Sequence, residues 1–407
     1  MPMFGSLLIV VGVAFAAPFI LGLFPRLRLP SVVLELIAGI IIGPSVLGIV
    51  HEDITIAVMA LIGLAFLLFL AGLEIEFPRL RGQVLRLTAA GFVLSFAIAL
   101  AVGALLRAGG LIQSPLLIAI VLCATSLGVL IPVLKDAGQI SSRFGQLVIA
   151  AGTIADFGAV ILLSIFFSGE GGIGATILLL GALAVFAIAI FLVVVGAERS
   201  MTISVNLRRL QDTTAQIRVR GAMVLLIAFA AVAEKLGLET ILGAFMAGAV
   251  LTLVDRDQAM THPDFRRKLE AMGFGLFIPV FFVTSGIRYD LQALLAKPSN
   301  LLMVPLFLAA LLAVRGIPAL LYRRAIDGRQ TLVAALMQAT SLPFIVAATA
   351  IGLSLHLVTA AESAALIAAG LLSVLLFPLI GLTLLRRGGA ARRAQAAPEE
   401  PAPTMAM

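Results

Sequence analysis

The sequence predicts an all-α polytopic membrane protein with about 13 transmembrane helices. Of its 407 residues, 61% are hydrophobic and only 12% are charged, whereas soluble domains are about 45–50% apolar and about 25% charged. Mean hydropathy is +1.17. The apolar residues also fall into long runs separated by short polar breaks that contain Gly or Pro. Each run approaches the roughly 20 residues that a helix needs to cross a bilayer.

Thirteen apolar segments fit this length. They are about 4–24, 30–50, 54–75, 84–107, 113–134, 142–168, 172–197, 219–234, 237–254, 268–287, 300–322, 330–354 and 361–385. The longest polar segment between two of them, 198–218, is charged and is expected to form a surface helix. The tail, 386–407, has low complexity and is expected to be a disordered cytoplasmic segment. Residues 1–385 therefore form one predicted transmembrane domain.

The distribution of basic residues predicts the orientation. Cytoplasmic loops of membrane proteins are enriched in Lys and Arg. With the N-terminus outside, 23 of the 28 Lys and Arg residues fall in cytoplasmic segments. We therefore expect the N-terminus outside, the C-terminus in the cytoplasm, and a location in a prokaryotic inner (plasma) membrane.

Composition also argues against several other classes of protein. The net charge of +7 lies in short loops, without a basic face interleaved with aromatic residues, so nucleic acid is not an expected partner. The single cysteine, Cys123, provides no disulfide framework. No zinc-binding pattern, phosphate-binding loop or Ser-His-Asp arrangement is present in the sequence, so we expect no enzyme activity, no cofactor and no resident metal ion.

Three sequence echoes indicate an internal repeat. Ala-Thr-Ser-Leu occurs at 124–127 and again at 339–342, an offset of 215 residues. The segment from Leu34 resembles that from Leu238, and the segment from Leu68 resembles that from Phe282. In each similar pair, the second span comes seven spans after the first. Because seven is an odd number, the two spans cross the membrane in opposite directions. The sequence thus predicts an inverted-topology repeat, with spans 1–6 repeated as 8–13 and span 7 as the connector.

The repeated Ala-Thr-Ser-Leu stretches predict two discontinuous helices that cross. Inverted repeats are typical of secondary transporters whose broken helices meet near the bilayer midplane. Thr125 and Thr340 lie about ten residues from the nearest cytoplasmic charge, which is roughly 15 Å of helix. Unwinding there frees carbonyl groups that hydroxyls or a cation can satisfy. We therefore expect Thr125, Ser126, Thr340 and Ser341 to contribute oxygen ligands for a cation. The alternative is that these hydroxyls only bond back to carbonyls of their own helices.

Two ionisable residues lie deep within predicted spans, where charge is costly and marks function. Asp156 is near the centre of the sixth span, and removal from water disfavours the charged form of a lone carboxylate. It can therefore exchange a proton for a cation, although a purely structural role as a cap of unwound backbone is the alternative. Arg315, in the eleventh span, is expected to balance helix dipoles or pair with a carboxylate, unless it extends to the interface.

Two other carboxylates, Glu74 and Glu76, come at the inner end of the third span. We expect them at the membrane interface rather than in the site. Asp156 therefore has no second deep carboxylate beside it, which argues against an intramembrane aspartyl enzyme.

At these motifs the chain resembles the monovalent cation:proton antiporter-2 family, of the sodium/hydrogen exchanger type. "LFLAGLEIE" resembles that family's third-span signature, "ATSLGVLIPVLKD" its first broken helix, "IADFGAVILL" its carboxylate helix and "ATSLPFIV" its second broken helix. The similarity covers about residues 5 to 385. It implies a homodimer in which spans 1–3 and 8–10 form a dimerisation half and spans 4–6 and 11–13 a transport half.

The chain departs from the family pattern at two positions. Electrogenic members have two adjacent Asp residues where this chain has Ala155-Asp156, and Asp156 matches the ion-binding position. They also have a Lys where this chain has Arg315. Loss of one carboxylate removes one proton carrier, which predicts electroneutral exchange. Potassium-efflux relatives often carry a nucleotide-binding domain after the last span, so such regulation here would need a separate regulatory subunit.

The sequence therefore favours a secondary active transporter that exchanges Na⁺ or K⁺ for H⁺ by alternating access at Asp156. Two alternatives remain open. One is a sodium-coupled organic-anion symporter, which would need a larger polar cavity and no titratable Asp. The other is a non-transporting membrane scaffold or sensor with a degenerate transporter fold, which Ala155 alone supports.

Overall fold

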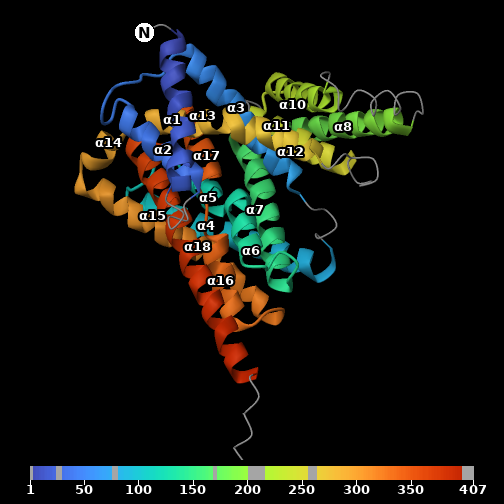
Figure 1. Cartoon of the computed structure of the whole chain (residues 1–407), viewed down its shortest axis with the longest axis vertical. Helices are drawn as coiled ribbons and strands as arrows, with labels where there is room; N and C mark the ends of the chain where they lie inside the picture. Colours follow the sequence, from blue (N-terminus) through green and yellow to red (C-terminus); the bar gives the residue numbers. More distant parts are fainter. Residues whose placement is uncertain are drawn as a thin grey trace, which may run out of the picture.

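The computed structural model describes residues 3–23, 30–75, 81–167, 172–199, 216–254 and 264–396. These residues form helices joined by short turns, with no strand among them (Figure 1). The elements are α1 (Met3–Leu23), α2 (Ser31–Ile42), α3 (Ile54–Leu73), α4 (Gly82–Ala108), α5 (Pro115–Cys123), α6 (Leu127–Asp136), α7 (Arg143–Phe167), α8 (Gly172–Arg199), α10 (Ile217–Lys235), α11 (Thr240–Val254), α12 (Asp264–Met272), the π-helix η2 (Gly273–Phe277), α13 (Ile278–Ile287), α14 (Leu291–Leu295), α15 (Pro298–Gly316), the 3-10 helix η3 (Ile317–Arg324), α16 (Gly328–Gln338), α17 (Pro343–Ser354) and α18 (Ala360–Ala396).

The predicted all-α polytopic fold is confirmed. Thirteen helical segments match the thirteen predicted spans, when α5–α6, α12–η2–α13, α15–η3 and α16–α17 are each taken as one segment. Nine of the described helices are long and apolar enough to cross a membrane, and three shorter apolar helices accompany them. α10, at the eighth predicted span, is less apolar because charged residues lie at both of its ends.

The C-terminal tail differs from its prediction. Disorder was expected from Arg386 onward, but α18 continues as a helix to Ala396. Ala, Arg and Gln are all strong helix formers and extend the helix that precedes them. Residues 397–407 lie outside the described part of the chain, as do Glu76 and most of the surface helix expected over 198–218.

The fifth and twelfth spans are each broken in the middle, so both predicted discontinuous helices are confirmed. α5 ends at Cys123 and α6 begins at Leu127, with three non-helical residues between them. α16 ends at Gln338 and α17 begins at Pro343. Proline has no N–H with which to continue α16, and it disfavours the helical conformation in the residue before it. The second break therefore lies immediately before Pro343.

The helices pack in two groups. In the first group, α1–α3 pack with α10–α13; in the second, α4–α7 pack with α15–α18. α8 contacts both groups, through α7 and α11. The groups also meet directly where α7 lies against α11, and there the rings of Phe157 and Phe245 stack with centroids 5.6 Å apart. The segment 288–297, which contains α14, links the first group to the second.

Glycines bring the helices of the first group into close contact. Gly72 and Gly248 face each other between α3 and α11, and Gly39 and Gly286 do so between α2 and α13. A Cβ added at any of the four would lie 2.0–2.2 Å from a carbonyl oxygen of the opposite helix. The two crossings are therefore built alike. This likeness supports the predicted inverted repeat, in which α2 corresponds to α11 and α3 to α13.

Gly72→Ala is expected to destabilise the protein, because the new Cβ would meet the Phe245 carbonyl oxygen 2.2 Å away. Overpacking of this kind costs about 1–3 kcal/mol. The melting temperature in detergent should fall by several degrees. Gly181→Ala on α8 is the matched control, since its Cβ would have nothing within 4 Å. Equal melting temperatures for the two variants would contradict the close crossing.

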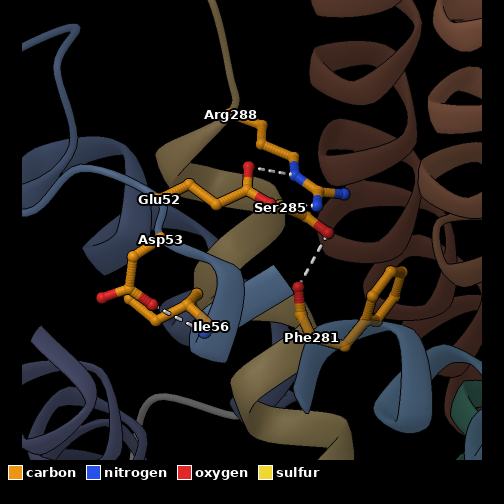
Figure 2. Close-up of polar contacts among 6 residues, drawn as sticks. All are labelled: Glu52, Asp53, Ile56, Phe281, Ser285 and Arg288. Carbon is orange, nitrogen blue, oxygen red and sulfur yellow. Dashed lines mark hydrogen bonds and ion pairs between the residues drawn. The ribbon is translucent and has the colours of Figure 1, made fainter. Parts of the chain in front are cut away.

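The turn before α3 is tied to the end of α13. Figure 2 shows Arg288 donating to Glu52 from Nε at 2.7 Å and from a second guanidinium nitrogen. In the same view, Asp53 caps α3 by accepting the Ile56 N–H at 2.9 Å. These contacts fix the α2–α3 turn to the start of the segment 288–297 that joins the two groups.

Candidate functional site

The two helix breaks bond to each other. The Ser126 N–H donates to the Thr340 carbonyl at 2.8 Å, and the Thr125 hydroxyl donates to the Gln338 carbonyl at 2.7 Å. Backbone groups at a helix break have lost their partners within the helix and need others. Here each break supplies partners for the other, so the two discontinuous helices are held where they cross.

α7 places Asp156 against the first break. The Thr125 N–H donates to Asp156 Oδ1 at 3.1 Å, and the N–H of Leu127, the first residue of α6, also acts on this carboxylate. A helix N-terminus carries a partial positive charge that favours an anion. Asp156 therefore caps α6 from a neighbouring helix, and the structural role considered for it is realised. Capping uses only part of the hydrogen-bonding capacity of a carboxylate, which leaves room for a proton or a cation.

Arg315 lies on the other side of Thr125 and is only 1% exposed. Its Nε donates to the Thr125 hydroxyl at 3.0 Å, one terminal nitrogen to the Ser95 hydroxyl at 3.2 Å, and the other to the Ala151 carbonyl at 3.4 Å. Within the described part of the chain no hydrogen bond joins Arg315 directly to Asp156. Arg315 does not extend to the interface. Its charge lies where α5 and α16 end. Because helix C-termini carry a partial negative charge, this position favours a cation.

A cavity of about 800 Å³ reaches this site. It lies between the two helix groups, with α2, α3, η2 and α13 along one wall and α6, α7, α17 and α18 along the other. The lining includes Pro30, just before α2, and Glu74, just after α3. The predicted topology puts both of these positions on the cytoplasmic side. Apart from Asp156 and Glu74, the lining residues are uncharged and mostly apolar.

The five residues predicted to bind the cation or proton fall into two sets. Asp156, Thr125 and Ser126 line the cavity, whereas Thr340 and Ser341 are fully buried and do not. The Ser126 hydroxyl has no hydrogen-bond partner among the described atoms. Of the predicted hydroxyl ligands, Ser126 is thus the one that belongs to a residue of the cavity wall and has no partner among the described atoms.

Three polar residues outside the predicted set also contribute. Ser95, on α4, accepts from Arg315. Ser373, on α18, accepts the Ser341 N–H at 3.1 Å and donates to the Ser341 carbonyl at 3.0 Å. Each is a small hydroxyl residue within an apolar span, a signal of interhelical bonding that could have identified it from sequence. The third is Glu74, expected only at the interface, which is half-buried and faces the cavity.

Comparison with known proteins agrees with this architecture. The sequence model of the family described as "Sodium/hydrogen exchanger, transmembrane" matches residues 11–387. The "Putative Na(+)/H(+) antiporter YjbQ" of Bacillus subtilis is 32% identical over 400 residues, which cover 94% of this chain. This chain spans 63% of the length of that relative. The "Na(+)/H(+)-K(+) antiporter GerN" of Bacillus cereus is 30% identical over 269 residues, covering 65% of this chain and 66% of that protein.

The fold also matches a solved structure. The sodium proton antiporter MjNhaP1 from Methanocaldococcus jannaschii, at pH 8, superposes with a TM-score of 0.66. The match covers 95% of this chain and 100% of the other, at 18% sequence identity, and therefore shows a common fold. The family match spans nearly all of the membrane domain, including both helix breaks and Asp156. This chain is an integral membrane protein that belongs to the sodium/hydrogen exchanger family of transporters.

Proposed function

We propose that this protein exchanges a monovalent cation, Na⁺ or K⁺, for H⁺ across the membrane, and that the two ions compete for Asp156. The observation that carries the proposal is the position of Asp156. It is a lone carboxylate at the crossing of two broken helices and at the wall of a cavity. A carboxylate removed from water must be compensated by a bound charge. Either a proton or a cation can supply that charge, and coupling follows because both cannot bind together.

The cavity supports alternating access. It opens between the two helix groups, so a movement of α4–α7 and α15–α18 against α1–α3 and α10–α13 would close it and open a path on the opposite side. The aromatic contact of Phe157 with Phe245 lies between the same groups, one residue along α7 from Asp156. Transporters with crossed broken helices commonly move as rigid bodies around a fixed site.

Several further features belong to this proposal. Because residue 155 is alanine, Asp156 is the single carboxylate at the two positions where electrogenic members have adjacent Asp residues. This supports one-for-one electroneutral exchange. The names of the relatives mention Na⁺ and, for GerN, also K⁺, so both cations are candidates. We also propose a homodimer formed through the first helix group, with the N-terminus outside and the C-terminus in the cytoplasm of a prokaryotic cell.

The experiment that tests the proposal uses purified protein in proteoliposomes with a pH-sensitive dye. Addition of NaCl or KCl, but not choline chloride, is expected to move protons in the opposite direction. The rate of proton movement should be the same with the membrane voltage clamped at zero or at a finite value, because an electroneutral exchanger moves no net charge. If a well-folded protein moves no protons on addition of Na⁺, K⁺ or Li⁺, the antiport proposal is wrong. Uptake of organic anions would then be tested.

Ser126→Ala is expected to weaken cation binding without harming the fold. Ser126 lines the cavity, and its buried hydroxyl has no partner among the described atoms, so its loss removes a candidate cation ligand and leaves no protein group unpaired. Loss of one such neutral ligand costs about 1 kcal/mol, or roughly a fivefold rise in KM for the cation.

Ser164→Ala is the matched control for Ser126→Ala. Ser164, on α7, is also buried and also lacks a partner among the described atoms, but it does not line the cavity. Its replacement should leave KM unchanged. Equal effects of the two substitutions on KM would remove Ser126 from the site.

A further inference from the structure

Glu74 is the second charged residue of the cavity wall. It follows directly after α3, and its N–H bonds back to the Leu70 carbonyl at 3.1 Å and the Ala71 carbonyl at 3.2 Å. From α11, the Thr252 hydroxyl, which bonds to the Gly248 carbonyl of its own helix at 3.1 Å, also lies 3.3 Å from the carbonyl oxygens of Gly72 and Leu73. The end of α3 is thus held in place by its own backbone and by α11. Glu74 is thereby fixed at the boundary between the membrane span and the cavity.

Two exposed residues of α12 also influence Glu74. Arg266 and Glu270 act on its carboxylate electrostatically. They also form an ion pair at 2.8 Å, with side chains 52% and 43% exposed. On the side of the cavity, Glu74 acts electrostatically on Asp156. Glu74 therefore lies between an exposed charged rim and the deep carboxylate.

We propose that Glu74 is a capture site that takes a monovalent cation from water at the mouth of the cavity and passes it to Asp156. The inference rests on the proposed cation exchange at Asp156. Its physical basis is the composition of the cavity. An apolar passage of this size attracts no cation by itself, whereas a fixed negative charge at its mouth raises the local cation concentration.

The capture site is also sensitive to pH. Glu74 lies just outside the membrane-spanning part of α3, and burial raises its pKa to about 7, while Arg266 lowers the pKa and Glu270 raises it. Above about pH 7 the carboxylate is mostly charged and attracts cations. Below about pH 7 it is mostly protonated, and the attraction weakens. The mouth of the cavity therefore attracts cations less strongly when the solution on its side becomes acidic. This effect is independent of competition at Asp156.

The test compares wild type with Glu74→Gln between pH 6 and pH 8.5. Apparent affinity for NaCl and KCl is measured in two ways, as KM in proteoliposomes and as thermal stabilisation by the cation in detergent, with choline chloride holding the ionic strength. At pH 8 the Gln variant should bind the cation roughly fivefold more weakly, as expected for loss of one partly screened charge. At pH 6 the two proteins should agree, because Glu74 is then protonated in wild type.

Two substitutions on α12 separate this role from a structural one. Removal of the neighbouring negative charge by Glu270→Gln should shift the midpoint of the pH dependence to lower pH. Removal of the positive charge by Arg266→Gln should shift it to higher pH. A merely structural Glu74 would not make the midpoint follow the signs of these charges.

The capture site is refuted if Glu74→Gln binds cations as tightly as wild type at pH 8, or if it weakens binding equally at pH 6 and pH 8. These outcomes are distinct from failure of the proposed function, in which wild type itself moves no protons on addition of cations. Thermal stabilisation needs no transport, so it tests Glu74 in either case.

Discussion

Asp156→Asn is expected to abolish cation-driven proton movement while leaving the protein folded. The amide keeps the shape of the carboxylate, and its oxygen can still accept the Thr125 N–H that now bonds to Oδ1 at 3.1 Å. What is lost is the charge. A cation 4 Å from a carboxylate gains about 4 kcal/mol at the effective dielectric constant of a protein site. Its removal weakens cation binding about a thousandfold, and the amide cannot carry the exchanged proton.

The matched control for this change is Asp53→Asn. Asp53 also accepts a backbone N–H, from Ile56 at 2.9 Å, but it caps α3 away from the cavity. Both variants should reach normal yields and melt cooperatively in detergent. The dye assay should then show proton movement for Asp53→Asn and none for Asp156→Asn. Substantial activity in Asp156→Asn would show that the coupling carboxylate lies elsewhere.

Arg315→Leu is expected to be both unstable and inactive. The guanidinium makes three hydrogen bonds in a fully buried position, to Thr125, Ser95 and Ala151. Leaving a buried polar group without its hydrogen-bond partner typically costs about 1–3 kcal/mol, and here three neutral acceptors lose their donor. Thr125 would lose the donor to its hydroxyl, and through Thr125 both the helix crossing and the contact with Asp156 would be disturbed. A fall in melting temperature and loss of transport are therefore expected together.

Arg315→Lys distinguishes charge from geometry. Lysine keeps the charge, but its ammonium is a single point that cannot reproduce the planar fork of donors. We expect a stability between those of wild type and Arg315→Leu, with the free energy of unfolding lowered by about 1–2 kcal/mol, and reduced transport activity. A double-mutant cycle with Thr125→Val should show coupling, since the two side chains bond to each other. An Arg315→Leu protein as stable and active as wild type would contradict this account of the crossing.

The helices and their breaks could be predicted because local chemistry determines them. Span length follows from bilayer thickness, and Pro343 cannot continue the helix before it. Asp156 and Arg315 were found because a charge deep in an apolar span is costly unless it has a function. Low complexity alone predicts disorder after Leu385, whereas the helix propensity of Ala and Arg favours the observed extension of α18 to Ala396.

The partners of these charged residues could not be predicted in the same way. Which hydroxyl meets Arg315 depends on how α4 packs against α15 and η3, and nothing in the sequence around Ser95 specifies that packing. Glu74 illustrates the same limit. Its place at the end of a span fits a position among lipid headgroups as well as one at a cavity between two helix groups. The side chain faces the cavity because α3 packs against α11 and α13, and those contacts are distant in sequence.

Proton release upon cation binding is the most direct test of competition at Asp156. Purified protein in weakly buffered detergent solution would be titrated with NaCl or KCl, and a pH indicator would report the protons released. The account predicts up to one proton released for each cation bound in wild type, and neither cation binding nor proton release in Asp156→Asn. Cation binding without proton release at any pH, or release that persists in Asp156→Asn, would contradict exchange at this carboxylate.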